Sequence, residues 1–223
     1  LMDMKQLVCV KWGTMYGPEY VNRLYGMVSR HITPPFRLVC LTDDRAGIRP
    51  EVECFDLPAL GVPHPQRTMG KWRKQILWGR SVPGLEGVAL FIDLDSVIVG
   101  PLDDYFSIGE PGDVYVARNW ARPLEKLGQT SVFRFPVGAN AHVLDDFRAD
   151  PQRIADTYQF EQHYVTHAVT GGVKFWPEDW TKHFRLHCMP TFPLCYFMTA
   201  RLPAGARIVT FPGGPNPDDV MVG

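Results

Sequence analysis

The sequence lacks any apolar run near the roughly 20 residues that cross a bilayer, and it has no excess of charge of either sign. Its 23 lysines and arginines nearly balance its 24 aspartates and glutamates, which gives a net charge of −1. A broad basic surface for nucleic acid or anionic lipid is therefore not expected. The first ten residues also lack the basic segment and cleavage site of a secretory signal. We expect a cytoplasmic protein without a transmembrane segment or a nucleic-acid partner, and a peripheral position at the inner membrane face stays open.

Cysteine is scarce and follows no ligand or disulfide spacing. The five cysteines form an odd set without a C-x-x-C pair, and Cys9 and Cys40 lie within apolar, strand-like runs. Core thiols in a reducing compartment are the expected state. The chain also contains no internal repeat and no domain-scale linker. With 223 residues, 45% of them hydrophobic, it is expected to form one domain over residues 1–223.

The pattern of apolar residues predicts an α/β architecture. In the first half we expect strands at 5–12, 35–44, 51–57 and 87–93 and helices at 17–32 and 69–80. A strand, a helix and a strand in that order predict a parallel pair with a right-handed crossover. In the second half we expect strands at 112–118, 130–135, 184–190 and 206–212 and helices at 142–158 and 161–169. The central sheet should be mostly parallel, and mixed in the second half.

The stretch ALFIDLDSVIVGPLDDYF contains the main functional signal, a D-x-D pattern at Asp93 and Asp95. Residues i and i+2 of a strand face the same side, so both carboxylates are expected to point at one small volume. Two like charges placed so close together repel each other, and a divalent cation bridging to a phosphate would relieve that cost. Ligands of open α/β sheets bind beyond the carboxyl ends of the strands, which is where this pattern lies.

Three interpretations of the D-x-D pattern compete. The two aspartates could simply cap a strand or turn. They could belong to a haloacid-dehalogenase-type phosphatase, but GDVY at 112–115 follows too soon to be the last acidic motif of that class. They could instead hold Mg²⁺ or Mn²⁺ on the diphosphate of a nucleotide-sugar donor, as in a GT-A type glycosyltransferase. We favour the third interpretation.

Several stretches support that choice because they resemble GT-A fold glycosyltransferases, particularly bacterial proteins similar to glycosyltransferase family eight. The resemblance covers about residues 6–217. The matching stretches are LVCVKWGTMYGPEYVNRLYGMV, RLVCLTDD, TMGKWRKQIL, FIDLDSVIVGPLDDYF, TSVFRF, FEQHYV and IVTFPGGPNP. The resemblance implies a Rossmann-like fold, with a nucleotide-binding half at about 1–107 and an acceptor-side half at about 108–223. It also implies a role such as polysaccharide biosynthesis.

The resemblance also implies roles for individual residues. Asp95 would ligate the metal, and Asp93 would contact the metal through water or the donor ribose. Glu161 would lie near the acceptor hydroxyl and, with Asp95, act in catalysis. The donor, most plausibly a UDP-sugar, would be bound by the turn at 11–17, the turn at 42–44 and a basic helix; the residues concerned are Lys11, Gly13, Tyr16, Thr42, Asp43, Lys71, Lys74 and Asp93.

Two positions depart from the family pattern. Pro212 stands where relatives carry a histidine that ligates the metal, so a third protein ligand is missing there. His187, Asp218 or Asp219 would be the replacements. Glu161 stands where relatives carry an aspartate, which keeps the carboxylate but lengthens its arm.

Many of these residues also have ordinary structural interpretations. Tyr16 could be a core residue, Asp43 part of a solvated turn, and the lysines of 69–80 a solvated face. His163 and His167 have the spacing of a zinc pair, but no H-E-x-x-H pattern or cysteine partner accompanies them, so a structural role is favoured. The aromatic residues of the second half, which include Trp176, Trp180, Phe192, Tyr196 and Phe197, could form a sugar platform or simply pack together.

The sequence therefore predicts a metal-dependent transferase that moves a sugar from a nucleoside diphosphate donor to a carbohydrate hydroxyl, with Mn²⁺ or Mg²⁺ as cofactor. A non-catalytic relative that keeps the nucleotide pocket without turnover is the main alternative, and Pro212 is its best support. The sequence does not distinguish a retaining from an inverting reaction.

Overall fold

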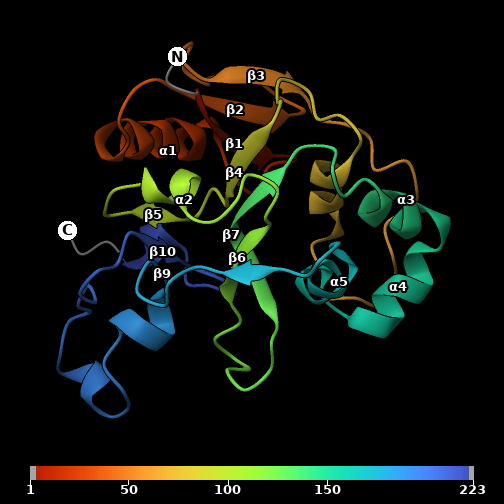
Figure 1. Cartoon of the computed structure of the whole chain (residues 1–223). Coiled ribbons are helices and arrows are strands. Elements are labelled where there is room, and N and C mark those ends of the chain that lie inside the picture. The colour runs from red at the N-terminus through yellow and green to blue at the C-terminus, as the bar shows by residue number, and fades with distance from the viewer. Residues whose placement is uncertain (1–3, 221–223) are drawn as a thin grey trace.

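The computed structural model describes residues 4–220, so residues 1–3 and 221–223 of the expected domain lie outside the described range. Two sheets organise the described chain. The larger has seven strands in the order β3-β2-β1-β4-β7-β6-β8, and the smaller has three in the order β5-β10-β9. Helices lie on both sides of the larger sheet, with α1 on one side and α3, α4 and α5 on the other (Figure 1).

The strands are β1 Lys5–Lys11, β2 Phe36–Thr42, β3 Glu53–Asp56, β4 Val88–Ile92, β5 Val97–Ile98, β6 Tyr115–Arg118, β7 Gly128–Pro136, β8 Lys174–Phe175, β9 Thr181–His183 and β10 Ile208–Thr210. The α-helices are α1 Pro18–His31, α2 Asp104–Ser107, α3 His142–Ala149, α4 Pro151–Tyr158 and α5 Glu161–Ala168. Short 3₁₀ helices cover Trp72–Trp78, Leu194–Tyr196 and Pro217–Val220, and a π-helical turn covers Phe184–Cys188.

The first half is the parallel unit that the sequence predicts. β1 pairs in parallel with β2 on one side and with β4 on the other. Both faces of β1 are buried because alternate residues enter different clusters: Leu7 and Cys9 pack on the α1 side, and Val8 and Val10 on the opposite side. Pro18 occupies the first turn of α1, where its missing N–H costs nothing.

The second half is mixed, as expected. β7 runs antiparallel to both β4 and β6, whereas β6 and β8 are parallel. The larger sheet is therefore parallel at four of its six strand pairs. The face of this sheet opposite α1 is covered by the 3₁₀ helix Trp72–Trp78 and by α3 to α5. There the ring of Trp72 stacks on the ring of Phe147, with centroids 5.2 Å apart.

Three predicted elements differ in the structure. The helix expected at 69–80 is a 3₁₀ helix confined to Trp72–Trp78. The helix expected at 142–158 is divided into α3 and α4 at Asp150, because Pro151 favours an extended residue before it and starts a new helix. The strand expected at 184–190 is wrong. That segment forms the π-helical turn, in which the side chain of His183 accepts a hydrogen bond from the backbone N–H of Arg185.

Among residues 4–220, the helices are too short or too polar to pass through a lipid bilayer.

Candidate functional site

The carboxyl ends of three neighbouring parallel strands meet at one edge of the larger sheet. β1 ends at Lys11 between β2, which ends at Thr42, and β4, which ends at Ile92. The chain leaves β1 toward β2 on one side, while β4 lies on the other, so this edge is a topological switch point. Open α/β sheets bind ligands at such points.

Asp93, the first residue after β4, is paired with a buried lysine from the 3₁₀ helix. The Lys74 ammonium lies 2.9 Å and 3.0 Å from the two carboxylate oxygens of Asp93. It also donates to the backbone carbonyl of Thr130, at 3.1 Å. Burial lowers the pKa of Lys74, but the charges of Asp93 and Glu161 outweigh burial, so its pKa lies above the ordinary value. Lys74 is therefore held protonated against the aspartate.

Asp95 contacts the turn that follows β1. The Tyr16 hydroxyl donates to an Asp95 carboxylate oxygen at 3.1 Å. Burial first, and then the negative charge of Asp93, raise the pKa of Asp95 to about 6. Each aspartate therefore accepts a hydrogen bond from a side chain of another element: Asp93 from Lys74, and Asp95 from Tyr16. These contacts argue against the interpretation that the two aspartates only cap the strand.

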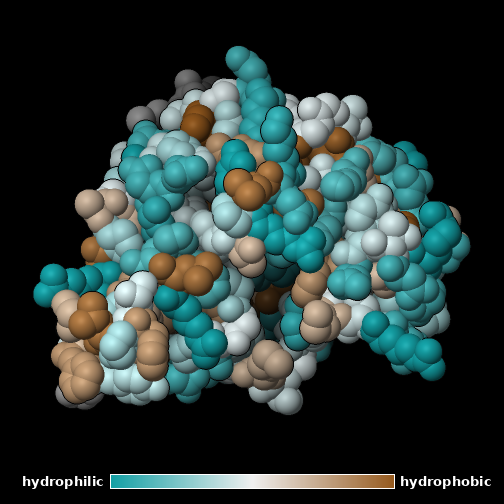
Figure 2. Space-filling model, turned by 90° about the horizontal axis from the view of Figure 1, so that it is seen from below, coloured by the Kyte–Doolittle hydropathy of each residue, from teal (hydrophilic) through white to brown (hydrophobic). Residues whose placement is uncertain are grey.

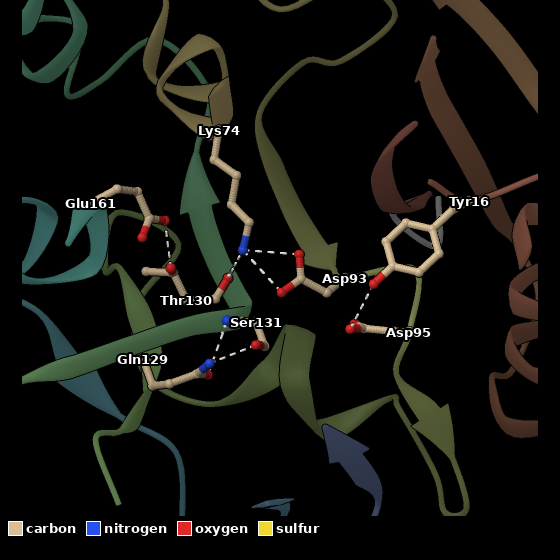
Figure 3. A network of polar contacts seen from close by, with 8 residues as sticks. All are labelled: Tyr16, Lys74, Asp93, Asp95, Gln129, Thr130, Ser131 and Glu161. Carbon is tan, nitrogen blue, oxygen red and sulfur yellow. Dashed lines mark hydrogen bonds and ion pairs between the residues drawn. The ribbon is translucent and has the colours of Figure 1, made fainter. Parts of the chain in front are cut away.

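A third carboxylate, that of Glu161 at the start of α5, lies on the other side of Lys74. The Thr130 hydroxyl donates to Glu161 at 2.5 Å. Burial is the main cause that raises the pKa of Glu161, and Lys74 and Thr130 oppose it. Figure 3 shows Tyr16 and Asp95 on one side of Asp93 and Thr130 and Glu161 on the other, with the Lys74 ammonium between the two carboxylates of Asp93 and Glu161.

The loops that follow β1 and β2, beside the aspartates, are joined by a hydrogen bond. The backbone N–H of Gly13 donates to the carboxylate of Asp43 at 2.9 Å, which joins the turns after β1 and β2. Gly13 has a φ of +60°, a conformation that favours glycine. Thr42 shapes the second turn, because its hydroxyl accepts from the N–H of Asp44 and donates to the carbonyl of Asp44. Lys11 is buried nearby, and its ammonium lies 3.5 Å from the carbonyl oxygen of Asp44.

The residues at this edge fit a divalent cation that is shared with a substrate. Within residues 4–220 there is no cluster of three or more His, Cys, Asp or Glu side chains that could hold a metal by itself. Mg²⁺ and similar hard ions, however, are commonly held by one or two carboxylates with phosphate oxygens and water completing the shell. Asp93 and Asp95 supply those oxygens; burial first, and then the charge of Asp93, raise the pKa of Asp95, and a bound cation would offset both costs.

A cavity of about 350 Å³ opens on the β6 side of the sheet. Trp120 and Trp176 line it together with Asn119, Arg118, Lys182 and His187. The Asn119 amide lies 3.4 Å from the His163 ring nitrogen on α5, which connects this cavity to the helix that begins with Glu161. Figure 2 shows that the face seen from below is hollowed near its centre. An aromatic lining with a few polar groups is typical of a small-molecule cavity.

Comparison with known proteins gives a likeness of structure rather than of sequence. No family model matches the chain, and a search of curated proteins found no match. Among solved structures, galactosyltransferase LgtC in complex with donor and acceptor sugar analogues is 10% identical with a TM-score of 0.65, over 95% of this chain and 88% of that one. Mouse xyloside xylosyltransferase 1 is 13% identical with a TM-score of 0.60, over 99% of this chain and all of that one. The bifunctional glycosyltransferase WbbM is 12% identical with a TM-score of 0.62. The match covers 97% of this chain but only 47% of WbbM, so this chain spans about half the length of that protein.

The chain has a glycosyltransferase fold. The expected GT-A architecture, with its mostly parallel sheet that becomes mixed in the second half, is confirmed. The solved structures named here are all glycosyltransferases, and none of them favours the dehalogenase-type phosphatase. The narrower likeness to glycosyltransferase family eight stays a prediction.

The glycosyltransferase fold brings most of the predicted donor residues to one edge. The loops that carry Lys11, Gly13, Tyr16, Thr42 and Asp43 lie beside the D-x-D turn. Lys71 and Lys74, expected on one helix face, differ in environment: Lys74 is buried against Asp93, and Lys71 is exposed because it precedes the 3₁₀ helix with a non-helical backbone.

Some residues of this edge were not predicted. Thr130 and Glu161 both lie in the half expected on the acceptor side, but nothing in the sequence pairs these two residues, which are 31 positions apart. Gln129 and Ser131 form another buried polar pair on β7. The signal that could have found them is the polar run G-Q-T-S at the start of a strand whose residues are otherwise apolar and buried. Trp120 was likewise not among the aromatics expected near an acceptor.

Proposed function

We propose that this protein is a metal-dependent glycosyltransferase that moves a sugar from a nucleoside diphosphate donor, with UDP as the expected nucleotide, to a carbohydrate hydroxyl. The observation that carries the proposal is the placement of Asp93 and Asp95 directly after β4, at the switch point of a glycosyltransferase fold. In this proposal residues 1–107 bind the nucleotide and residues 108–223 bind the acceptor, within one domain.

Asp93 and Asp95 would hold Mn²⁺ or Mg²⁺ at this site, where the bound ion supplies a positive charge for the departing diphosphate. Lys74 adds a second fixed positive charge to the same volume, since its ammonium lies on Asp93. Fixed charges that meet developing negative charge without rearranging are an effective source of rate enhancement. Tyr16 orients Asp95 through its hydroxyl, and it stands in the turn that would meet the base.

Glu161 is the candidate for the acceptor side of the reaction. Its carboxylate is buried and hydrogen-bonded to Thr130, and its pKa is raised mainly by burial. A carboxylate with a raised pKa is a better proton acceptor near neutral pH than an exposed one. The nearby cavity offers the sugar acceptor the ring of Trp120, whereas Trp176 is buried at the edge of the cavity. The LgtC structure, which contains donor and acceptor sugar analogues, supports a fold with room for both.

The test is release of UDP from a panel of UDP-sugars, measured first with Mn²⁺ and then with EDTA. We expect release from at least one UDP-sugar with Mn²⁺ and loss of that release when EDTA removes the metal. The Asp95→Asn variant should lose it by about 100-fold or more, because an amide is a poor ligand for a hard cation. Release that is unaffected by EDTA and by this substitution would refute the proposed role of the metal.

A nucleotide-sugar-binding protein without turnover is the second candidate. Pro212 favours it, because no imidazole stands at that position to complete a metal shell. The same measurements separate the two functions. UDP binding without turnover of any donor under any metal condition would favour the binding protein.

A further inference from the structure

An unusual surface lies outside the candidate site, in residues 185–202, here called the apolar loop. Large hydrophobic side chains protrude from it: Phe192 is 79% exposed, Tyr196 75% and Phe197 84%, and Leu186, Leu194, Met198 and Leu202 are also exposed. Single exposed hydrophobic residues are common, but a contiguous group marks an interaction surface. Figure 2 shows hydrophobic residues gathered at the lower left of the face seen from below.

The base of the apolar loop is held to the rest of the molecule. Cys188 is buried and packs with Val209 and Phe211 of the last strand region. The N–H of Arg201 donates to the carbonyl of Cys188 at 2.8 Å, which closes the loop at its neck. The chain between these two residues contains only one short 3₁₀ turn, Leu194–Tyr196. The hydrophobic tips are thus presented outward from a fixed base.

The charged residues within the apolar loop all have one sign. Between Asp179 and Asp218 the sequence has no aspartate or glutamate, and it has four cationic residues, Lys182, Arg185, Arg201 and Arg207. Arg207 is paired with Asp104, whereas Arg185 and Arg201 are exposed within the loop itself. The apolar loop therefore combines an excess of positive charge with seven of the large hydrophobic side chains that are exposed in the described chain.

We propose that the apolar loop docks onto the surface of a lipid bilayer that contains anionic lipids. Aromatic side chains favour the interface between acyl chains and headgroups, and nearby arginines are attracted to anionic headgroups. A second copy of this chain fits less well, because a symmetric contact would bring the same arginines of two loops together. The docking goes beyond the proposed function and does not depend on it.

Docking would bring one end of the cavity lined by Trp120 close to the bilayer. Leu186, an exposed residue of the apolar loop, also lines that cavity with Lys182 and His187. If the proposed function holds, an acceptor hydroxyl carried on a membrane-bound molecule would reach the cavity from this side.

The test is co-sedimentation of the full chain with vesicles of phosphatidylcholine alone or of phosphatidylcholine with phosphatidylglycerol. We expect binding to the anionic vesicles only. The variant Phe192→Ser/Tyr196→Ser/Phe197→Ser should fold normally, because all three side chains are exposed. It should reduce the vesicle partition coefficient by more than about tenfold. Arg185→Glu/Arg201→Glu should reduce it by a similar factor, about tenfold or more, through lost attraction to the anionic surface.

Matched substitutions elsewhere serve as controls. Leu124→Ser replaces a side chain that is 99% exposed in another loop, and Arg80→Glu reverses an exposed charge on the opposite part of the chain; neither should change vesicle binding. Wild-type protein that fails to bind anionic vesicles, or a triple variant that binds like wild type, would overturn the proposal. A dimer in sedimentation velocity that the triple variant abolishes would assign the apolar loop to self-association instead. UDP binding by the triple variant is measured separately. That measurement distinguishes a failure of membrane docking from a failure of the proposed glycosyltransferase function.

Discussion

At the scale of single residues, the site depends on how one lysine is shared between carboxylates. Lys74 lies on Asp93, and Glu161 adds a second negative charge within its electrostatic reach. The sequence made Asp93 and Asp95 easy to find because they end an apolar strand. It did not reveal the burial of Lys74 or the Thr130–Glu161 bond, because these depend on segments that only the tertiary fold brings together.

The Lys74→Met variant tests the energetics of that pair. Removing the ammonium leaves Asp93 without its cation, so the free energy of unfolding should fall by about 2 kcal/mol. The value is lower than for a fully buried pair because the Asp93 side chain is 25% exposed. Urea denaturation of Lys74→Met, Asp93→Asn and the double variant gives the coupling between the two residues.

The control within that cycle is the Asp93→Asn background, in which the carboxylate that contacts Lys74 directly is absent and only the more distant charge of Glu161 remains. There Lys74→Met should cost clearly less than it does in the wild type. An equal cost in both backgrounds would mean that Lys74 stabilises the protein through packing and not through its charge.

At the scale of elements, the sequence predicted helices and strands reliably where the spacing of apolar residues and a turn or capping residue indicated the same boundary. The strands of the first half and α1 match expectation to within a few residues, because apolar runs and Pro18 define their limits. The segment 184–190 was predicted wrongly because its apolar residues resemble a strand. It follows β9 directly, and the backbone turns there, since the Nδ1 atoms of His183 and His187 accept backbone N–H groups.

Those two histidines make the π-helical turn sensitive to acid. The His187 ring accepts from the N–H of His183 at 2.9 Å, and burial first, then Lys182, lowers the pKa of His187. A lowered pKa means that the unfolded chain takes up the proton first as the pH falls. The free energy of unfolding should therefore decrease as the pH falls below about 6.5, because a protonated ring cannot accept the bond.

The His187→Asn variant checks this prediction, since its amide oxygen can accept the same bond without titrating. Between about pH 7 and about pH 5, wild type should lose up to about 1 kcal/mol more unfolding free energy than the variant. Urea denaturation across this range gives the difference. Groups with raised pKa values, such as Glu161, act in the opposite direction but are common to both proteins. Parallel curves for the two proteins would contradict the assignment.

At the scale of the whole molecule, the composition indicated the class of protein but not how charged and apolar residues are distributed over its surface. The net charge of −1 correctly describes a balanced chain, but it conceals a positive, apolar loop that follows the candidate acceptor cavity. Likewise, the α/β pattern predicted the sheet, whereas the order of its strands and the meeting of the loops after β1, β2 and β4 required the structure. Local sequence patterns do not specify which distant segments become neighbours in the fold.

The central claim is that two carboxylates at the switch point bind a divalent cation on a nucleotide diphosphate. Calorimetric titration of UDP, with Mn²⁺ and with EDTA, tests it most directly in wild type and in Asp93→Asn/Asp95→Asn, which preserves shape. Wild type should bind UDP at least about tenfold more tightly with Mn²⁺, and the double variant should bind it equally under both conditions. A double variant that keeps the full gain from Mn²⁺ would contradict the account.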